Sequence, residues 1–297
     1  MDDIIGLTAD NLTIHLVELI RRTSTVLPED VVAKIRYYRD KEDAGSRAAR
    51  TLNAILRNID MAESGSRPMC QDSGTVTFDI HYPFGLRQSE LLETIQSAAR
   101  IATEKNYLRP NVVDPVTGIP KPDNVGRGHP AIYFDQWDKD YMEVMLVLKG
   151  GGCENVGAQY SLPYTPLNAG RDMDGIKKVA LDAVAKAQGK GCSPGVLGIG
   201  IGGDRAQGYV LGKKQLHRKL DDVNPDPQLR ELEEWLVENS NTLGIGPMGF
   251  GGRTTLLGAK AAVMDSIPAS FFVSVVYMCW AYRRRKMIIL GGEVEYD

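Results

Sequence analysis

Residues 1–63 carry apolar positions at the spacing of helices. The stripes, which recur every three or four positions, consist of Leu12, Leu16, Leu19 and Ile20, and of Ala48, Leu52, Ile55 and Ile59. Such a spacing indicates one buried face of a helix. Pro28 suits the first turn of a further helix between the two stripes. The pattern therefore predicts a helical N-terminal layer over residues 1–63.

After a polar loop at 64–74, the pattern changes to strands that alternate with helices. Apolar runs and alternation predict strands at 75–82, 143–149, 196–203, 271–278 and 287–290. Helical periodicity predicts helices at 88–105, 173–187, 205–213 and 227–239, and a glycine loop at 244–255 is expected to lead into another helix. The stretch 106–139, rich in Pro, Gly, Asn and Asp, predicts a long ordered loop.

This order of elements predicts a mixed α/β fold. We expect a single domain over 1–297, in which the helical layer 1–63 packs on a mixed β-sheet part, 64–297, with glycine-rich loops. Apolar residues and glycine alternate in the run VLGIGIGG at 196–203, which predicts a buried strand that another backbone segment approaches closely. The spacing of these glycines does not match a nucleotide-binding loop.

Composition and charge narrow the possible partners. The chain has 297 residues, a hydrophobic share of 43%, a charged share of 25% and a formal net charge of -3, so a nucleic-acid partner is not expected. The acidic N-terminus is unlike a signal peptide and no apolar run reaches membrane-spanning length, which predicts a cytoplasmic protein without a membrane partner. The basic run 283–286 fits a solvated face best. Alternatively, its charges set the local electrostatic field or pair with a partner subunit.

The four cysteines are Cys70, Cys153, Cys192 and Cys279. A disulfide framework is not expected in a cytoplasmic chain of this size. Cys70, Cys192 and Cys279 each lie at the end of a strand-like or loop segment. Next to each of them is a glycine or another element that exposes the backbone. Because they are far apart in sequence, spacing alone leaves buried core thiols and metal ligands equally open.

Six motifs follow one another along the chain in a recognisable order. They are PMCQDSG at 68–74, LRPN at 108–111, KGGGCEN at 149–155, GKGCSPGVLGIGIGG at 189–203, LGIGPMGFGG at 243–252 and CWAYRR at 279–284. Together they resemble the alpha subunit, or N-terminal domain, of class I fumarate hydratases and L-tartrate dehydratases. The resemblance implies a hydro-lyase that reversibly hydrates a small dicarboxylate, with fumarate/malate as the first expectation and L-tartrate as the second.

The resemblance also implies a cofactor. Cys70, Cys192 and Cys279 would hold a [4Fe-4S] cluster, and Cys153 would not be a ligand. Three thiolates leave one iron without a protein ligand, and such an open iron can act as a Lewis acid on substrate oxygens.

Further positions are implied to bind or activate the dianionic substrate. Asp72 would orient the catalytic base or exchange a proton with it. Gln71 and Arg109 would contact the substrate, and the amides of Gly151 and Gly152 would add donors. From the residues alone, Arg109 fits a solvated surface arginine and Asp72 fits a turn residue before Ser73 and Gly74.

One position departs from the family pattern. Ile267 stands where these enzymes usually have a substrate-binding histidine, twelve residues before the third cysteine. Because isoleucine cannot donate a hydrogen bond, the choice of dicarboxylate stays open.

The resemblance also implies partners. A beta subunit would supply the remaining catalytic residues, and the alpha chain would pair with a copy of itself. A non-enzymatic iron-sulfur protein on the same scaffold and a structural zinc protein are the alternatives.

Overall fold

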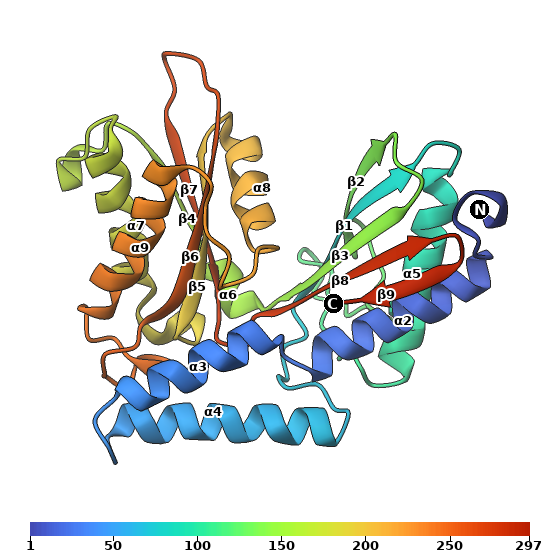
Figure 1. The fold of residues 1–297 in the computed structure, drawn as a ribbon, viewed down its shortest axis with the longest axis horizontal. Helices are drawn as coiled ribbons and strands as arrows, with labels where there is room; N and C mark the ends of the chain where they lie inside the picture. The colour runs from blue at the N-terminus through green and yellow to red at the C-terminus, as the bar shows by residue number, and fades with distance from the viewer. The chain divides into compact units, whose positions relative to one another are not determined.

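The computed structural model describes residues 1–297, the side chain of Asp2 excepted. The chain forms two compact units, and Figure 1 shows the elements of each. The first unit comprises Met1–Pro28, Asn58–Gly150 and Arg283–Asp297, and the second comprises Glu29–Arg57 and Gly151–Tyr282.

The first unit contains a five-stranded sheet in the order β2-β1-β3-β8-β9. The strands are β1 (Thr75–Pro83), β2 (Ala131–Trp137), β3 (Met142–Lys149), β8 (Arg283–Leu290) and β9 (Glu293–Tyr296). β1 and β2 are parallel, whereas the other neighbouring pairs are antiparallel. The last segment of the chain therefore lies inside this sheet, beside a strand from its middle.

Helices cover one face of this sheet. They are α2 (Ala9–Thr25) and α5 (Gln88–Glu104), while α1 (Asp2–Ile5) lies beside the turn between β8 and β9. The core joins Leu16 of α2 and Ile95 of α5 to Phe78 and Ile80 of the sheet, all fully buried. Burying apolar area of this kind contributes about 25 cal/mol per Å² of stabilisation. The predicted helical stripe and the predicted strand 75–82 share this core and are both stabilised by it.

The second unit contains a four-stranded sheet in the order β4-β7-β5-β6. The strands are β4 (Ala158–Ser161), β5 (Gly195–Gly202), β6 (Leu256–Met264) and β7 (Phe272–Met278). Helices α7 (Met173–Ala187) and α9 (Pro227–Asn241) lie on one face, and α8 (Arg205–Gln215) lies on the other (Figure 1). This unit also includes α3 (Glu29–Lys41), α6 (Gly151–Asn155) and the short helices η1 (Thr165–Leu167), η2 (Gln188–Gly191) and η3 (Pro247–Gly249), while α4 (Arg47–Ser64) extends across the division.

Glycine and apolar residues alternate in β5, and the two faces of this strand have correspondingly different neighbours. A Cβ atom on Gly198 would lie 2.1 Å from the carbonyl oxygen of Gly212, and one on Gly200 would lie 2.1 Å from that of Gly208. The backbone of α8 therefore packs directly on the glycine face of β5. Leu197 and Ile199 point to the other face and join the core with α7 and α9. The predicted close approach of another backbone segment is confirmed.

The structure corrects three expectations about the elements. Residues after the glycine loop 244–255 form β6 rather than a helix, because pairing with β5 outweighs the helical preference of an alanine-rich segment. The stretch 106–139 contains β2, an edge strand whose weak burial pattern gave no alternation to detect. Arg283 and Arg284, expected on a solvated face, are 1% and 4% exposed within β8.

The mixed α/β fold class with an N-terminal helical layer is confirmed. The expectation of a single domain over 1–297 stays a prediction. Among the described residues, no helix is both long and apolar enough to cross a lipid bilayer.

Candidate functional site

The loop before β1 carries three of the predicted site residues of the first unit. Oδ1 of Asp72 accepts hydrogen bonds from the backbone N–H of Gly74 at 2.8 Å and from Nδ2 of Asn111 at 3.2 Å. The backbone N–H of Asp72 donates to Sγ of Cys70 at 3.4 Å. Asp72 is thus a turn residue, as its sequence context indicated, and it is also bonded to the LRPN motif. The carboxylate and the Cys70 sulfur are held in one short loop.

The LRPN segment is fixed against this loop through its backbone. The N–H of Arg109 donates to Oγ of Ser73 at 2.7 Å. Asn124, 2% exposed, donates to the Arg109 carbonyl at 2.8 Å and accepts from the Asn111 N–H at 2.9 Å. These bonds hold the backbone while the side chain of Arg109 remains exposed. The structure therefore brings Cys70, Gln71, Asp72 and Arg109 together in the first unit.

His129 supports this arrangement from below Asn124. Its Nδ1 lies 2.7 Å from the carbonyl oxygen of Asn124, and the N–H of Val76 donates to its Nε2 at 3.4 Å. Burial lowers the pKa of His129 below the ordinary value of 6.5. The neutral ring can then donate from Nδ1 and accept at Nε2, which gives this histidine a structural role.

A hollow of about 1030 Å³ opens beside the two loops. Gln71, Arg109 and Asn111 line it together with two further cations, Arg67 and Lys105. No acidic side chain is among its described lining residues. Such a site suits a small anion, because carboxylates bind most strongly to charged and bidentate donors. The sequence motifs pointed to Gln71 and Arg109, whereas Arg67 and Lys105 were missed.

A further positive charge lies beneath the same loop. Arg283 begins β8, and its Nη2 donates to the carbonyl oxygen of Asp72 at 2.9 Å. Its guanidinium is buried, so the charge is poorly screened by solvent. Arg283, the first arginine of the basic run, therefore holds the loop that carries Cys70.

In the second unit, the register of the sheet brings Cys192 and Cys279 to one end. β5 and β7 are antiparallel, with Val196 opposite Met278. Cys192 precedes β5 and Cys279 follows β7, and the N–H of Trp280 donates to the carbonyl oxygen of Cys192 at 3.2 Å. Antiparallel pairing places the start of one strand next to the end of the other. Cys192 is half-buried and Cys279 is buried.

Glycine-rich segments surround this end of the sheet. Oγ of Ser193 donates to the carbonyl oxygen of Gly246 at 2.6 Å, and the N–H of Met248 donates to that of Ser193 at 2.7 Å. A Cβ atom on Gly152 would lie 3.3 Å from the carbonyl oxygen of Lys190. The predicted positions Gly151 and Gly152, at the start of α6, thus lie beside the loop that carries Cys192.

Cys153 differs from the other thiols in its surroundings. It is 3% exposed, and its Sγ lies 3.9 Å from the carbonyl oxygen of Gly191. Tyr277 packs in the same region, where burial, and then the charges of Cys279, Cys153 and Cys192, raise the pKa of Tyr277 well above its ordinary value of 10.0. The three thiols of this unit therefore share one electrostatic environment.

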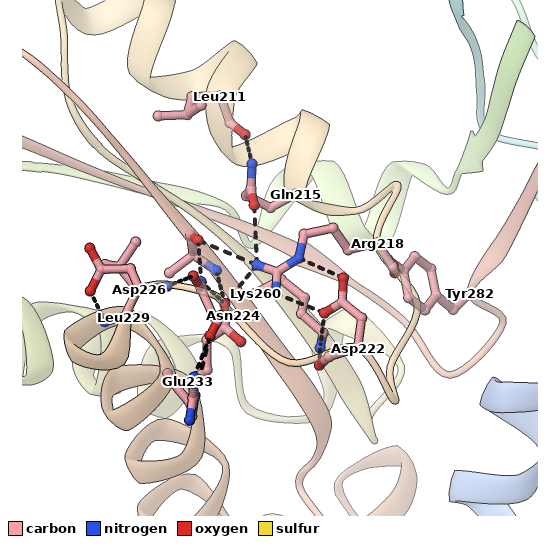
Figure 2. Close-up of polar contacts among 12 residues, drawn as sticks. Leu211, Gln215, Arg218, Asp222, Asn224, Asp226, Leu229, Glu233, Lys260 and Tyr282 are labelled. Carbon is pink, nitrogen blue, oxygen red and sulfur yellow. Dashed lines mark hydrogen bonds and ion pairs between the residues drawn. The ribbon is translucent and has the colours of Figure 1, made fainter. Parts of the chain in front are cut away.

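Polar contacts anchor the segment that follows Cys279. The hydroxyl of Tyr282 donates to the carbonyl oxygen of Leu216 at 2.6 Å. Figure 2 shows the network beyond it, in which Glu233, 6% exposed, accepts from Nη1 of Arg218 and from Nδ2 of Asn224, each at 2.7 Å. The loop between α8 and α9 is thereby fixed to β6 and to the cysteine-bearing segment.

Ile267 lies away from the cysteines of its unit. It is 68% exposed in the loop between β6 and β7, at the end of the sheet opposite to Cys192 and Cys279. The 7 residues of β7 span about 23 Å at ~3.3 Å per residue. Arg171 ties this loop down by donating to the carbonyl oxygens of Pro268 and Ala269. Within this unit, the isoleucine has no contact with the cysteine end.

A second group of ligand-type atoms lies on the first unit. Asp79, His81 and Asp135 place one ligand atom each within 4.8 Å of one another. His81 also stacks on Trp137, with 4.9 Å between the ring centroids. Carboxylate and imidazole ligands suit a divalent cation, whereas iron-sulfur clusters need thiolates. This group is therefore unrelated to the cysteine framework.

The cysteine side chains fit an iron-sulfur group by their chemistry. None of the four cysteines forms a disulfide, and Cys70 and Cys192 are partly accessible on loops. The buried hydroxyl of Tyr277 has no hydrogen-bond partner among the described residues, and it lies among the thiols of the second unit. Soft sulfur donors and an unsatisfied buried donor are both compatible with a sulfur-rich cofactor.

The structure is a mixed α/β protein with loop cysteines outside any disulfide and a cation-lined hollow that suits small anions. Comparison with known proteins identifies it further. Residues 13–288 match the family model described as fumarate hydratase (fumerase). The chain belongs to the fumarate hydratase family.

Individual relatives are similar over most of this chain. It is 56% identical over 270 residues to a Geobacillus stearothermophilus protein provisionally named fumarate hydratase class I, which covers 90% of this chain and 52% of that protein. It is 36% identical over 274 residues to a Methanocaldococcus jannaschii protein provisionally named L(+)-tartrate dehydratase subunit alpha, covering 91% and 94%. It is 29% identical over 271 residues to the L(+)-tartrate dehydratase subunit alpha of Escherichia coli K12, covering 90% and 86%. The chain thus spans about half of the first relative and most of the two alpha subunits.

Proposed function

We propose that this chain is the alpha-type component of a [4Fe-4S]-dependent hydro-lyase that adds water to, or removes it from, a small dicarboxylate, fumarate/malate first. The observation that carries the proposal is the cation-lined hollow beside the loop of Cys70, Gln71 and Asp72. Membership of the fumarate hydratase family supports the reaction class. Cys70, Cys192 and Cys279 are the proposed cluster ligands.

Each predicted residue has a role that its surroundings support. When bound, the cluster supplies a Lewis-acidic iron for substrate oxygens. Arg109 binds one carboxylate, helped by Lys105 and Arg67 in the same hollow, and Gln71 donates or accepts a further hydrogen bond. Asp72, oriented by Asn111 and by the N–H of Gly74, takes part in proton exchange.

The glycines at the start of α6 are further proposed substrate-binding positions. The amides of Gly151 and Gly152 are proposed to add donors for the substrate, since both residues are exposed beside the loop that carries Cys192.

A partner chain belongs to the proposal. Two relatives are named alpha subunits, which supports our inference that a separate beta subunit supplies the remaining catalytic residues. The proposed assembly is a cytoplasmic heteromer in which the alpha chain also pairs with a copy of itself.

The test starts with the cluster and continues with turnover. The chain is reconstituted anaerobically with iron and sulfide, and both are quantified in variants in which one cysteine at a time is changed to serine. We expect C70S, C192S and C279S to lose iron and sulfide, whereas C153S, whose thiol is buried against Gly191, keeps them. Zinc binding without labile sulfide would contradict the cofactor assignment.

Turnover then decides between the reactions. The reconstituted chain, co-expressed with a beta-type partner, is assayed with fumarate, malate and L-tartrate. The names of the alpha-subunit relatives keep L-tartrate as the second candidate. A cluster-loaded assembly without turnover of any of these acids would refute the hydro-lyase proposal and favour a non-enzymatic iron-sulfur protein.

A further inference from the structure

Tyr277 has a buried hydroxyl without a hydrogen-bond partner. The residue is 2% exposed on β7, and its Oη has no hydrogen-bond partner among the described residues. An unsatisfied buried hydroxyl is costly, and phenylalanine would fill the same space without that cost. The hydroxyl therefore requires a partner that the side chains of this unit do not provide.

The loop of Cys192 is shaped around the ring of Tyr277. A Cβ atom on Gly191 would lie 2.5 Å from Cε1 of the ring, and one on Gly195 would lie 2.4 Å from Oη. Side chains cannot approach so closely, so both positions must lack a Cβ for the ring to lie against the loop. The glycines of the GKGCSPG motif on either side of Cys192 thus make room for this phenol.

The other two thiols of the unit lie around the same ring. Cys279 directly follows the last residue of β7, with one residue between it and Tyr277. Sγ of Cys153 lies 3.9 Å from the carbonyl oxygen of Gly191, which borders the ring. The unpartnered hydroxyl is therefore placed among sulfur atoms, at the end of the sheet that carries both proposed ligands of this unit.

We propose that Tyr277 is a tuning residue whose hydroxyl donates a hydrogen bond to a negatively charged sulfur of the iron-sulfur centre held by Cys192 and Cys279. This inference rests on the proposed function, because it needs the cluster. Hydrogen bonds to cluster sulfurs favour the reduced, more negative state and raise the reduction potential. Tyr277 therefore makes the centre harder to oxidise.

The test compares Y277F with Y160F in the anaerobically reconstituted full-length chain. Tyr160 is the matched control, since it is 7% exposed in the same core and its hydroxyl donates to Asp182 at 2.7 Å. We expect Y277F to shift the one-electron equilibrium of the centre about tenfold toward the oxidised state, ~59 mV in midpoint potential. The midpoint is read by dye-mediated titration with electron paramagnetic resonance. Y160F is expected to leave it unchanged.

A second measurement begins with the wild-type chain, and this part does not depend on how the variants fold. In the wild-type chain, electron-nuclear double resonance of the reduced centre should show an exchangeable proton coupling that disappears in D₂O and is absent from Y277F. Equal midpoints in wild type and Y277F, equal shifts in Y277F and Y160F, or a wild-type spectrum without an exchangeable proton would each overturn the inference, while the proposed function would stand. A wild-type chain that takes up no iron and sulfide would overturn both.

Discussion

Glu233 is the centre of the polar network in the second unit, and its charge can be tested directly. Its Oε1 accepts hydrogen bonds from Arg218, from Asn224 and from the backbone N–H of Ala261, each at 2.7 Å. The change Glu233→Gln keeps the shape of the side chain, but it removes the charge and turns one acceptor oxygen into a donor. The variant can then satisfy fewer of the donors that converge on this point.

The expected loss follows from the burial of the pair. Hydrogen bonds to charged groups contribute about 1.5–3 kcal/mol each, and breaking a buried ion pair costs about 3–5 kcal/mol. Since Arg218 retains its bonds to Asp222 and glutamine retains one acceptor oxygen, we expect the lower end. A loss of about 3 kcal/mol corresponds to roughly a 150-fold change in the unfolding equilibrium.

Amide hydrogen exchange measured by mass spectrometry can detect this loss in the unit where it arises. Peptides from α9 and β6 should exchange about 150-fold faster in the variant, whereas peptides from β1 and β3, in the other unit, serve as internal references. Glu234→Gln is the matched control, because Glu234 is exposed on the same helix. If Glu233→Gln stays within about twofold of Glu234→Gln, where surface changes fall, the network does not stabilise this unit as argued.

Three further predictions concern other parts of the chain. Gly198→Ala would place a Cβ atom 2.1 Å from the Gly212 carbonyl oxygen, so the free energy of unfolding, measured by thermal unfolding, should fall by about 2–3 kcal/mol. Gly126→Ala, whose new Cβ atom would have its nearest neighbour at 3.6 Å, should change it little. Equal losses in the two variants would contradict the packing argument. The hydrogen bond from Arg21 lowers the pKa of Glu18 from 4.5 to about 2. The ionised Glu18 therefore stabilises the fold above pH 4.5, and this stabilisation is lost as the pH falls through about 2. Because the pair is partly exposed, we expect Glu18→Gln to remove less than about 1 kcal/mol at pH 7 and to flatten thermal stability between pH 5 and pH 2; an unchanged slope would argue against this pair. Arg109→Met should weaken dicarboxylate binding by about 10- to 100-fold in calorimetric titration, and Arg127→Met, exposed in the same segment, should not; parallel effects would rule out a specific clamp.

The sequence predicted best those elements whose local signals agree with their packing. Helix α7 begins and ends where predicted, because Asp172 caps it and its apolar stripe faces the core. β6 was assigned wrongly because its alanine-rich sequence favours a helix, and only pairing with the distant β5 decides the outcome. Strands β2, β4 and β9 were missed because edge strands bury too little to show alternation.

The candidate site was predictable in its motifs and not in its surroundings. Cys70, Gln71 and Arg109 were identified because they belong to recognisable runs of sequence. Arg67 and Lys105 gave no such signal, since a surface cation becomes a binding residue only when folding brings it to the hollow. Tyr277 read as one more apolar strand position, because a hydroxyl without a partner can be recognised only after its neighbours are placed.

The discontinuous make-up of the first unit sets an order for folding during synthesis. All residues of the second unit precede Arg283, so that unit can complete its sheet before the ribosome reaches β8. Until then, the backbone of β3 has no neighbour on one side, and an open strand edge invites pairing with other chains. Newly made chains should therefore be most prone to aggregation in the interval before β8 emerges, and chaperone binding at this stage would protect the edge of β3.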